Sequence, residues 1–395
     1  MKRFLADRIS GLGTESAFEV LARARKIESQ GVKVIHMEIG EPDFSSPARV
    51  IGSAAKALHQ GQTKYCAAGG LAAVQEVIAD YSGKLRNIKF EPSEVVIVPG
   101  AKPILSYTMM ACVNPGDEVI YPNPGFPIYE SLIRFCGGIP VPLPIEEIGD
   151  NFSIDVDKLA KLITPKTKML ILNSPHNPTG GILTNKELSE IAKLCIKNDL
   201  LVLSDEVYSK IYYDEAPTSI GSFPGMKERT VIVDGFSKTF SMTGWRLGYG
   251  LMPQELAQHI SRLIINSNSC TAPFVQIAGA EAILNCQDET TKMVQEFAKR
   301  REILINGLNT IPGLYCHKPK GAFYAFPNIT GTGNTSTKLA HDLLEKAGVA
   351  VLDGASFGEY GKNYLRLSYA TSVDNIYAAL NRIDLFLNNR KLSMM

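Results

Sequence analysis

A lysine followed by an arginine, in the segment SKTFSMTGWRLGYG (237–250), is the pattern of this chain with the clearest chemical meaning. The apolar run just before it predicts a buried strand, so Lys238 would lie just past a strand end. A lysine removed from water there has a lowered pKa and can attack a carbonyl as a free amine. Ser237 and Arg246 could together hold a phosphate, the serine by its hydroxyl and the arginine by its forked guanidinium. The ordinary alternative is an exposed loop lysine beside a structural arginine.

Three further polar motifs follow or begin predicted elements. PGAK starts a predicted helix, so the free N–H groups of Ala101 and Lys102 could receive a phosphate. NSPHNPTG follows a predicted strand and offers Asn177, and SDEVY follows the next one and offers Asp205 and Tyr208. Because ligands of open α/β sheets bind beyond the carboxyl ends of the strands, these groups are expected to converge.

An imine-forming lysine, a phosphate clamp and this polar set are what pyridoxal phosphate requires. Asp205 would face the pyridine nitrogen, and Asn177 and Tyr208 would donate to the ring hydroxyl oxygen. Phe126 in NPGFPIY would stack on the ring. Each motif alone also has a structural interpretation: Asp205 could cap a helix and Phe126 could be core packing. Four motifs in this order favour the cofactor.

Composition narrows the class of protein. The chain has 395 residues, 45% of them hydrophobic, which suggests two domains or one large domain with an appendage. A net charge of +1 without a basic face argues against nucleic-acid binding, and no apolar run is long enough to span a bilayer. Seven cysteines without a C-x-x-C pair, and a beginning without a signal-peptide pattern, favour a cytoplasmic protein with reduced thiols. The six histidines lack metal-ligand spacing, so no metal site is expected.

Hydrophobic patterns predict the elements that position these residues. Continuous apolar strands separated by helices indicate a mostly parallel sheet covered on both faces. A predicted helix over 288–308 begins a region of shorter elements, which we expect to be a second domain. The expected organisation is an N-terminal arm and part of the small domain (1–47), a large cofactor-binding domain (48–286) and a small C-terminal domain (287–395). The expected strands of the large sheet are 95–98, 118–121, 139–143, 168–172, 200–204, 230–233 and 247–251.

Together these motifs resemble the fold-type I, pyridoxal-phosphate-dependent aminotransferases of class I/II, near the prokaryotic aspartate aminotransferases. The resemblance covers nearly the whole chain. It implies an α/β fold with a large domain, whose mostly parallel seven-stranded sheet is sandwiched by helices, and a smaller α+β domain. The further matching segments are GEPDF, KYCAAGG, NPGDEVI, KGAFYAFP and YLRLSYA.

The resemblance also implies roles for single residues. Lys238 matches the Schiff-base lysine, and Arg366 matches the arginine that forks the substrate α-carboxylate. Gly40 matches a glycine whose backbone approaches substrate. Tyr65 matches a tyrosine that reaches the phosphate of the neighbouring subunit, which implies a homodimer with shared active sites. Lys102 matches a lysine that can meet a distal substrate carboxylate, or it is a solvated lysine in the first turn of its helix.

The implied activity is ping-pong transfer of an amino group between an L-amino acid, preferably aspartate or glutamate, and a 2-oxo acid. Two departures from the family weaken the substrate assignment: Phe126 stands where Trp or Tyr is frequent, and a second arginine for dicarboxylates is not found. Aromatic, alanine-type or sulfur amino acids, or a carbon–sulfur lyase reaction, stay open as alternatives. A regulator built on this fold is disfavoured, since no added DNA-binding segment is seen.

Overall fold

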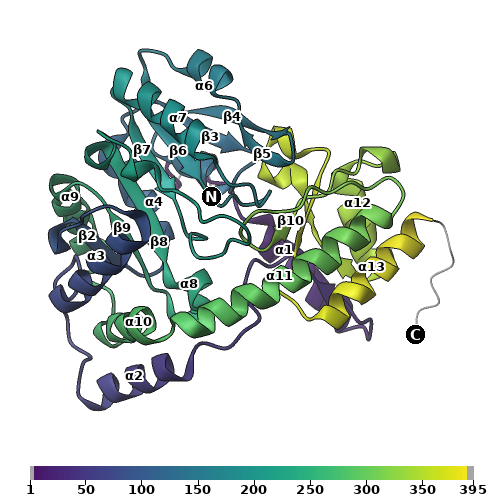
Figure 1. Ribbon diagram of the computed structural model, residues 1–395, viewed down its shortest axis with the longest axis horizontal. Coiled ribbons are helices and arrows are strands. Elements are labelled where there is room, and N and C mark those ends of the chain that lie inside the picture. The colour runs from purple at the N-terminus through teal and green to yellow at the C-terminus, as the bar shows by residue number, and fades with distance from the viewer. Residues whose placement is uncertain (1–3, 389–395) are drawn as a thin grey trace.

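The computed structural model describes residues 4–388. Within these residues, eight strands form one large sheet in the order β2-β9-β8-β7-β6-β3-β4-β5 (Figure 1). Their bounds are β2 Val95–Val98, β3 Glu118–Asn123, β4 Ile139–Ile148, β5 Asn151–Ile154, β6 Thr167–Asn173, β7 Leu201–Asp205, β8 Thr230–Gly235 and β9 Gly248–Leu251. The chain of neighbours β4–β3–β6–β7–β8 is parallel, whereas β2, β5 and β9 are antiparallel to their neighbours.

The predicted count of seven strands is wrong, because β5 adds an eighth. β5 pairs antiparallel with the second half of β4, across a turn at residues 149–150. Pro140, Pro142 and Pro144 interrupt the apolar pattern of β4, and β5 is only four residues long. A short hairpin of this kind leaves little periodicity in the sequence.

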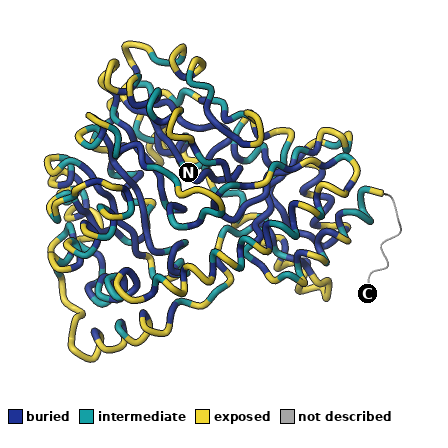
Figure 2. The backbone as a smooth tube through the Cα atoms, in the orientation of Figure 1, coloured by how far each residue is buried: buried dark blue, intermediate teal, exposed yellow. Residues whose placement is uncertain are grey.

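Helices cover both faces of the large sheet. In β2, Val95 and Ile97 pack in the hydrophobic cluster that holds α3 and α10, whereas Val96 and Val98 pack in the cluster that holds α4 and α9. All four side chains are buried, which explains why this strand is apolar without alternation. Figure 2 shows the buried strands at the centre and the exposed residues on the outer helices. The helices of this part are α2 Ala48–His59, α3 Ala72–Arg86, α4 Lys102–Cys112, α5 Ile128–Phe135, α6 Val156–Leu162, α7 Asn185–Lys197, α8 Phe236–Thr239, α9 Gln254–Ile265 and α10 Pro273–Asn285.

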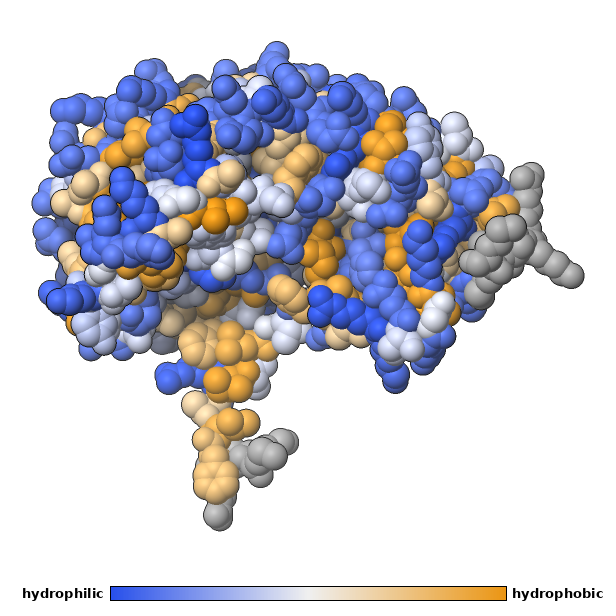
Figure 3. Space-filling model, turned by 90° about the horizontal axis from the view of Figure 1, so that it is seen from below, coloured by the Kyte–Doolittle hydropathy of each residue, from blue (hydrophilic) through white to orange (hydrophobic). Residues whose placement is uncertain are grey.

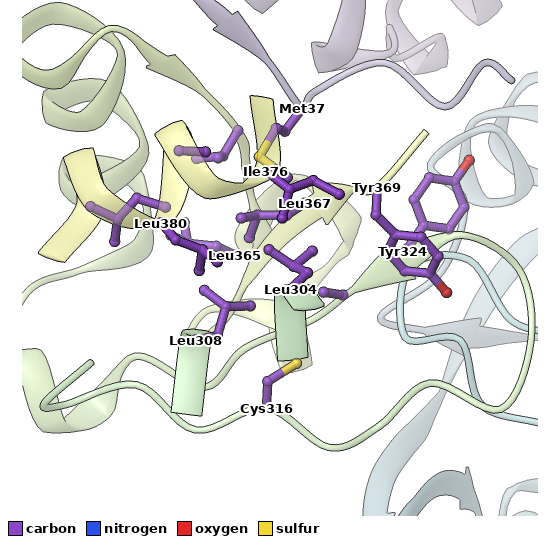
Figure 4. Packing of buried hydrophobic residues seen from close by; sticks show 14 of the residues in the cluster. Met37, Leu304, Leu308, Cys316, Tyr324, Leu365, Leu367, Tyr369, Ile376 and Leu380 are labelled. Carbon is purple, nitrogen blue, oxygen red and sulfur yellow. The ribbon is translucent and has the colours of Figure 1, made fainter. Parts of the chain in front are cut away.

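The long helix α11 (Gln287–Thr310) runs from beside α10 into the C-terminal part of the chain (Figure 1). There the strands β10, β13 and β12 form an antiparallel sheet, and β1 pairs in parallel with β11. Figure 4 shows Met37 packed with Leu304 of α11 and Leu367 of β13, so the segment after the N-terminal helix α1 shares a core with the C-terminal elements. The remaining bounds are α1 Ser16–Glu28, β1 Ile35–His36, β10 Tyr324–Ala325, α12 Ser336–Asp342, β11 Val349–Ala350, β12 Leu352–Asp353, β13 Leu365–Ser368 and α13 Val373–Leu387. The domain boundaries at residues 47 and 286 stay a prediction.

Residues 4–388 offer neither a candidate membrane-spanning helix nor a candidate metal cluster. None of the helices over residues 4–388 has the length and apolar character that spanning a membrane would require. The same residues contain no group of three or more His, Cys, Asp or Glu side chains placed to hold a metal ion.

Candidate active site

A cavity of about 520 Å³ opens where β6, β7 and β8 end, between the large sheet, α1 and the C-terminal elements. It gathers residues that are more than 300 positions apart in the sequence, from α1 to Arg366 in β13. The predicted site residues that line it are Gly40, Ala101, Lys102, Phe126, Asn177, Asp205, Tyr208, Ser237, Lys238, Arg246 and Arg366.

Lys238 lies in α8, the short helix that directly follows β8. Its removal from water lowers the pKa of its amine to about 8, against the opposing effect of the Glu41 carboxylate. The amine donates a hydrogen bond to the backbone carbonyl of Gly40. A Cβ atom at Gly40 would lie 2.1 Å from the Tyr324 hydroxyl, so glycine lets this backbone approach. The structure therefore places a lysine that is easily deprotonated in the cavity wall.

Asp205, the last residue of β7, is a buried carboxylate without a cationic partner among the bonds it makes. The Tyr129 hydroxyl donates to its Oδ2 at 2.7 Å, and the Val207 N–H donates to its Oδ1 at 3.3 Å. Burial raises the pKa of Asp205 to about 6, while the Tyr129 hydrogen bond opposes that rise. A buried carboxylate of this kind is suited to a protonated ring nitrogen.

Arg246 and the start of α4 form a second group of polar atoms in the cavity wall. Arg246 has a left-handed backbone (φ 53°) and donates from Nη1 to the Thr243 carbonyl at 2.7 Å. A Cβ atom at Gly100 would lie 2.1 Å from the Arg246 Nη2, so glycine is required for the guanidinium to reach α4. Ala101 precedes α4 without a side-chain cap, and Ser237 lines the same cavity. A guanidinium, free N–H groups and a hydroxyl together fit a phosphate.

Arg366, in β13, also lines the cavity. Its Nη1 donates to Asn177 Oδ1 at 3.2 Å and its Nη2 to the Glu38 carbonyl. Its buried Nε has no hydrogen-bond partner among residues 4–388, and its guanidinium packs over the Tyr324 ring at 4.5 Å. A buried guanidinium with an unused donor suits a bound carboxylate.

Lys102 has a partner that the sequence did not predict. Its amine forms an ion pair with Glu15, the residue before α1, and lies 5.4 Å from the centre of the Phe126 ring. Phe126 itself makes an edge contact with Tyr129, with ring centres 5.7 Å apart. Lys102 therefore lines the cavity as predicted, but its amine is already paired with the Glu15 carboxylate.

Four further residues belong to the site and were missed. Tyr324 donates to or accepts from the Tyr208 hydroxyl at 2.7 Å, and Asn173 Oδ1 accepts from the Asn177 N–H at 2.9 Å. The other two are Tyr129 and Glu15. Three of the four, Tyr324, Asn173 and Tyr129, lie inside motifs already noted (KGAFYAFP, NSPHNPTG and NPGFPIY), and that position was their available signal.

Tyr65 lies outside this cavity. Its side chain is 88% exposed, so it contacts little of its own chain. The neighbouring Cys66 thiol donates to the carbonyl of Thr271, so Tyr65 lies close to that residue in the fold.

Fold and cavity define a class of enzyme that uses a lysine-bound cofactor with a phosphate group. The family model "Aminotransferase class I and II" matches residues 32–383, and the chain belongs to that family. The chain is 40% identical over 390 residues to the putative aminotransferase YugH of Bacillus subtilis, covering 98% of this chain and 99% of the relative. It is 40% identical over 367 residues to an aspartate aminotransferase of Pyrococcus abyssi, covering 91% and 93%. The solved structure of an aromatic aminotransferase from Pyrococcus horikoshii matches with a TM-score of 0.88 and 40% identity, covering 94% of this chain and all of that one.

The protein is therefore a transaminase that uses pyridoxal phosphate and takes amino-acid and 2-oxo-acid substrates. The cavity fits this cofactor on independent grounds. Lys238 has a lowered pKa, Asp205 is buried without a cation, and Arg246 meets the free start of α4. The unused Nε of Arg366 leaves a place for a substrate carboxylate.

Proposed function

We propose that this aminotransferase acts on acidic amino acids, moving the amino group between L-aspartate or L-glutamate and a 2-oxo acid by a ping-pong mechanism. The observation that carries the proposal is that Arg366 and Lys102 line the same cavity as Lys238. Two cations flanking one reactive amine match a substrate with two carboxylates: Arg366 takes the α-carboxylate and Lys102 the distal one.

The cofactor, when bound, supplies an electron-accepting ring to the substrate Cα. The chain's own groups bind the cofactor and move the proton in this proposal. Lys238 Nζ holds the cofactor and then carries the proton away from and back to the reacting carbons. Asp205 keeps the proton on the ring nitrogen, and Asn177 and Tyr208 bind the ring hydroxyl oxygen. Arg246, Ser237 and the N–H groups of Ala101 and Lys102 hold the phosphate, and Phe126 covers the ring.

A second candidate, transamination of aromatic amino acids, has an observation of its own. Lys102 is neutralised by Glu15, so an uncharged side chain would leave no unpaired charge beside it. Phe18, Ile39 and Leu105 add apolar surface to the cavity wall.

The first test is the absorption spectrum of the purified, cofactor-loaded protein before and after adding L-aspartate without any 2-oxo acid. Conversion of the lysine-bound cofactor band to the pyridoxamine phosphate band is the expected result. A band that aspartate leaves unchanged, but that phenylalanine converts, would contradict the acidic substrate and favour the second candidate. Release of ammonia and pyruvate would instead indicate a lyase, and intersecting rather than parallel double-reciprocal plots would contradict ping-pong kinetics.

We also propose a homodimer with shared active sites, in which Tyr65 of each subunit reaches the phosphate of the other. Its 88% exposure supports this, because a tyrosine without a role in its own chain is available to a second copy. The N-terminal segment carries exposed apolar side chains, among them Leu5 and Ile9, while residues 7–11 pack against α5. Figure 3 shows a narrow, mostly hydrophobic projection from the molecule. All seven cysteines are free thiols, which supports the proposed cytoplasmic location.

A further inference from the structure

The carboxylate of Glu15 is turned into the cavity instead of capping its own helix. Glu15 is the N-cap residue of α1, where a side-chain oxygen ordinarily accepts a hydrogen bond from the first turn. It makes no such bond and contacts the Lys102 amine. Its side chain is 19% exposed, against 47% for Lys102. The chain therefore places one of its own carboxylates on the cation proposed for the substrate's second carboxylate.

Other charged groups of the cavity do not take over this contact. Glu41 accepts a hydrogen bond from the Thr243 hydroxyl, so its carboxylate is held on the Arg246 side. The Nη1 and Nη2 groups of Arg366 donate to Asn177 and to the Glu38 carbonyl. Glu15 is thus the carboxylate that a substrate must replace at Lys102.

A transaminase binds two substrates with different side chains at one site, because the amino donor and the 2-oxo-acid acceptor bind one after the other. An acidic side chain needs Lys102 as its partner. An uncharged side chain needs Lys102 to be neutralised, because an unpaired cation beside an apolar group is costly. One carboxylate that pairs with Lys102 and can leave it meets both needs.

We propose that Glu15 is a specificity-determining residue: it pairs with Lys102 when the bound side chain is uncharged and yields Lys102 to the second carboxylate of an acidic substrate. This inference rests on the proposed role of Lys102 in acidic-substrate recognition. It adds that the affinity for dicarboxylates is set by competition with a carboxylate of the protein itself.

The test compares Glu15→Gln with the wild type, both loaded with cofactor. Calorimetry measures the binding of two unreactive acids, succinate with two carboxylates and 3-phenylpropanoate with one. Removing the competing charge should lower the Kd of succinate by about fivefold to tenfold, the change in affinity that a half-buried ion pair contributes. The Kd of 3-phenylpropanoate should not fall. The ratio of kcat/KM for L-aspartate over L-phenylalanine should rise in the same direction. This expectation also holds if the wild type turns over aspartate poorly.

The matched control is Glu19→Gln. Glu19 is on the same helix and binds the Thr14 hydroxyl at 2.9 Å at an exposed position, so its loss should leave both Kd values unchanged. Equal shifts for both acids in Glu15→Gln, or no shift, would overturn the proposal.

Lys102→Met separates this proposal from the proposed function. It should weaken the binding of succinate. If Lys102→Met left succinate binding unchanged, the acidic-substrate function would fail. If Lys102→Met weakened succinate but Glu15→Gln did not strengthen it, only the competition by Glu15 would be wrong.

Discussion

The pKa of Lys238 has a consequence for stability that can be measured without any substrate. In the unfolded chain a lysine keeps its proton up to about pH 10.4, whereas the folded protein releases it near pH 8. Between these values the unfolded state binds more protons, so the free energy of unfolding rises with pH through this group. Below pH 8 the folded state carries the full penalty of a charge removed from water.

We therefore expect Lys238→Met to raise the melting temperature of the cofactor-free protein at pH 7, and the gain to shrink toward pH 10. Thermal unfolding across this pH range checks it. Lys84→Met is the control, because Lys84 is an exposed residue of α3 paired with Asp80. A stabilisation that does not depend on pH would show that packing of the methionine, and not the amine charge, is responsible.

The sequence predicted single site residues where a motif carried them, and their roles stay a prediction. Lys238, Asp205 and Asn177 follow predicted strand ends, and the cavity brings them together. Tyr324 and Glu15 were missed because their partners, Tyr208 and Lys102, are 116 and 87 positions away, and no local pattern encodes a contact of that range.

At the scale of elements, Arg86 at the end of α3 joins two strands that carry site residues. It contacts Glu206, next to Asp205, at 2.6 Å and Asp234, at the end of β8, at 2.5 Å. Arg86→Met would leave two buried carboxylates without a cation, which costs about 3–5 kcal/mol. Urea unfolding should show this loss.

The control for Arg86→Met is again Lys84→Met on the same helix, expected to cost at most about 0.5 kcal/mol because its ion pair is exposed. Similar costs for the two variants would mean that the Arg86 network does not hold the strand ends together.

Gly100 connects β2 to α4, and its substitution tests the phosphate corner. In Gly100→Ala the new Cβ would displace the Arg246 guanidinium, so the affinity for pyridoxal phosphate should fall. Gly116→Ala is the matched control: its φ is similarly positive (92° against 84°), but nothing lies within 4 Å of its Cβ. Both variants share the backbone strain of about 1–2 kcal/mol, and only Gly100→Ala should lose cofactor affinity. Cofactor titration by fluorescence measures the difference, and equal losses would remove the proposed role of Arg246.

Elements with a clear hydrophobic pattern in the sequence were predicted closely, and irregular elements were not. The strand predicted over 95–98 matches β2, whose four buried residues form one continuous apolar run. β5 was missed because its four residues lie after a turn and a proline-rich strand. Its partner, the second half of β4, continues the sheet beyond the predicted end at residue 143.

At the scale of the whole molecule, shared sites predict rescue between two defective variants. Lys238→Ala should be inactive, and Tyr65→Ala should bind cofactor weakly if Tyr65 serves the partner subunit. A mixed dimer of the two contains one site with both Lys238 and Tyr65 intact. Mixing and refolding the variants should therefore restore up to about a quarter of the wild-type activity, the share expected for random pairing with one good site in each mixed dimer. No recovery would mean that Tyr65 acts in its own subunit or that the chains do not pair.

The order of the site residues along the chain has a consequence for synthesis. The residues proposed to hold the cofactor end at Arg246, whereas Arg366 follows 120 positions later. Because a nascent chain emerges from its N-terminus and folds as it emerges, the cofactor-holding residues that one chain supplies can come together on the ribosome before the carboxylate-binding arginine has been made. Binding of the cofactor and binding of the substrate then become possible at two separate stages in the synthesis of each chain.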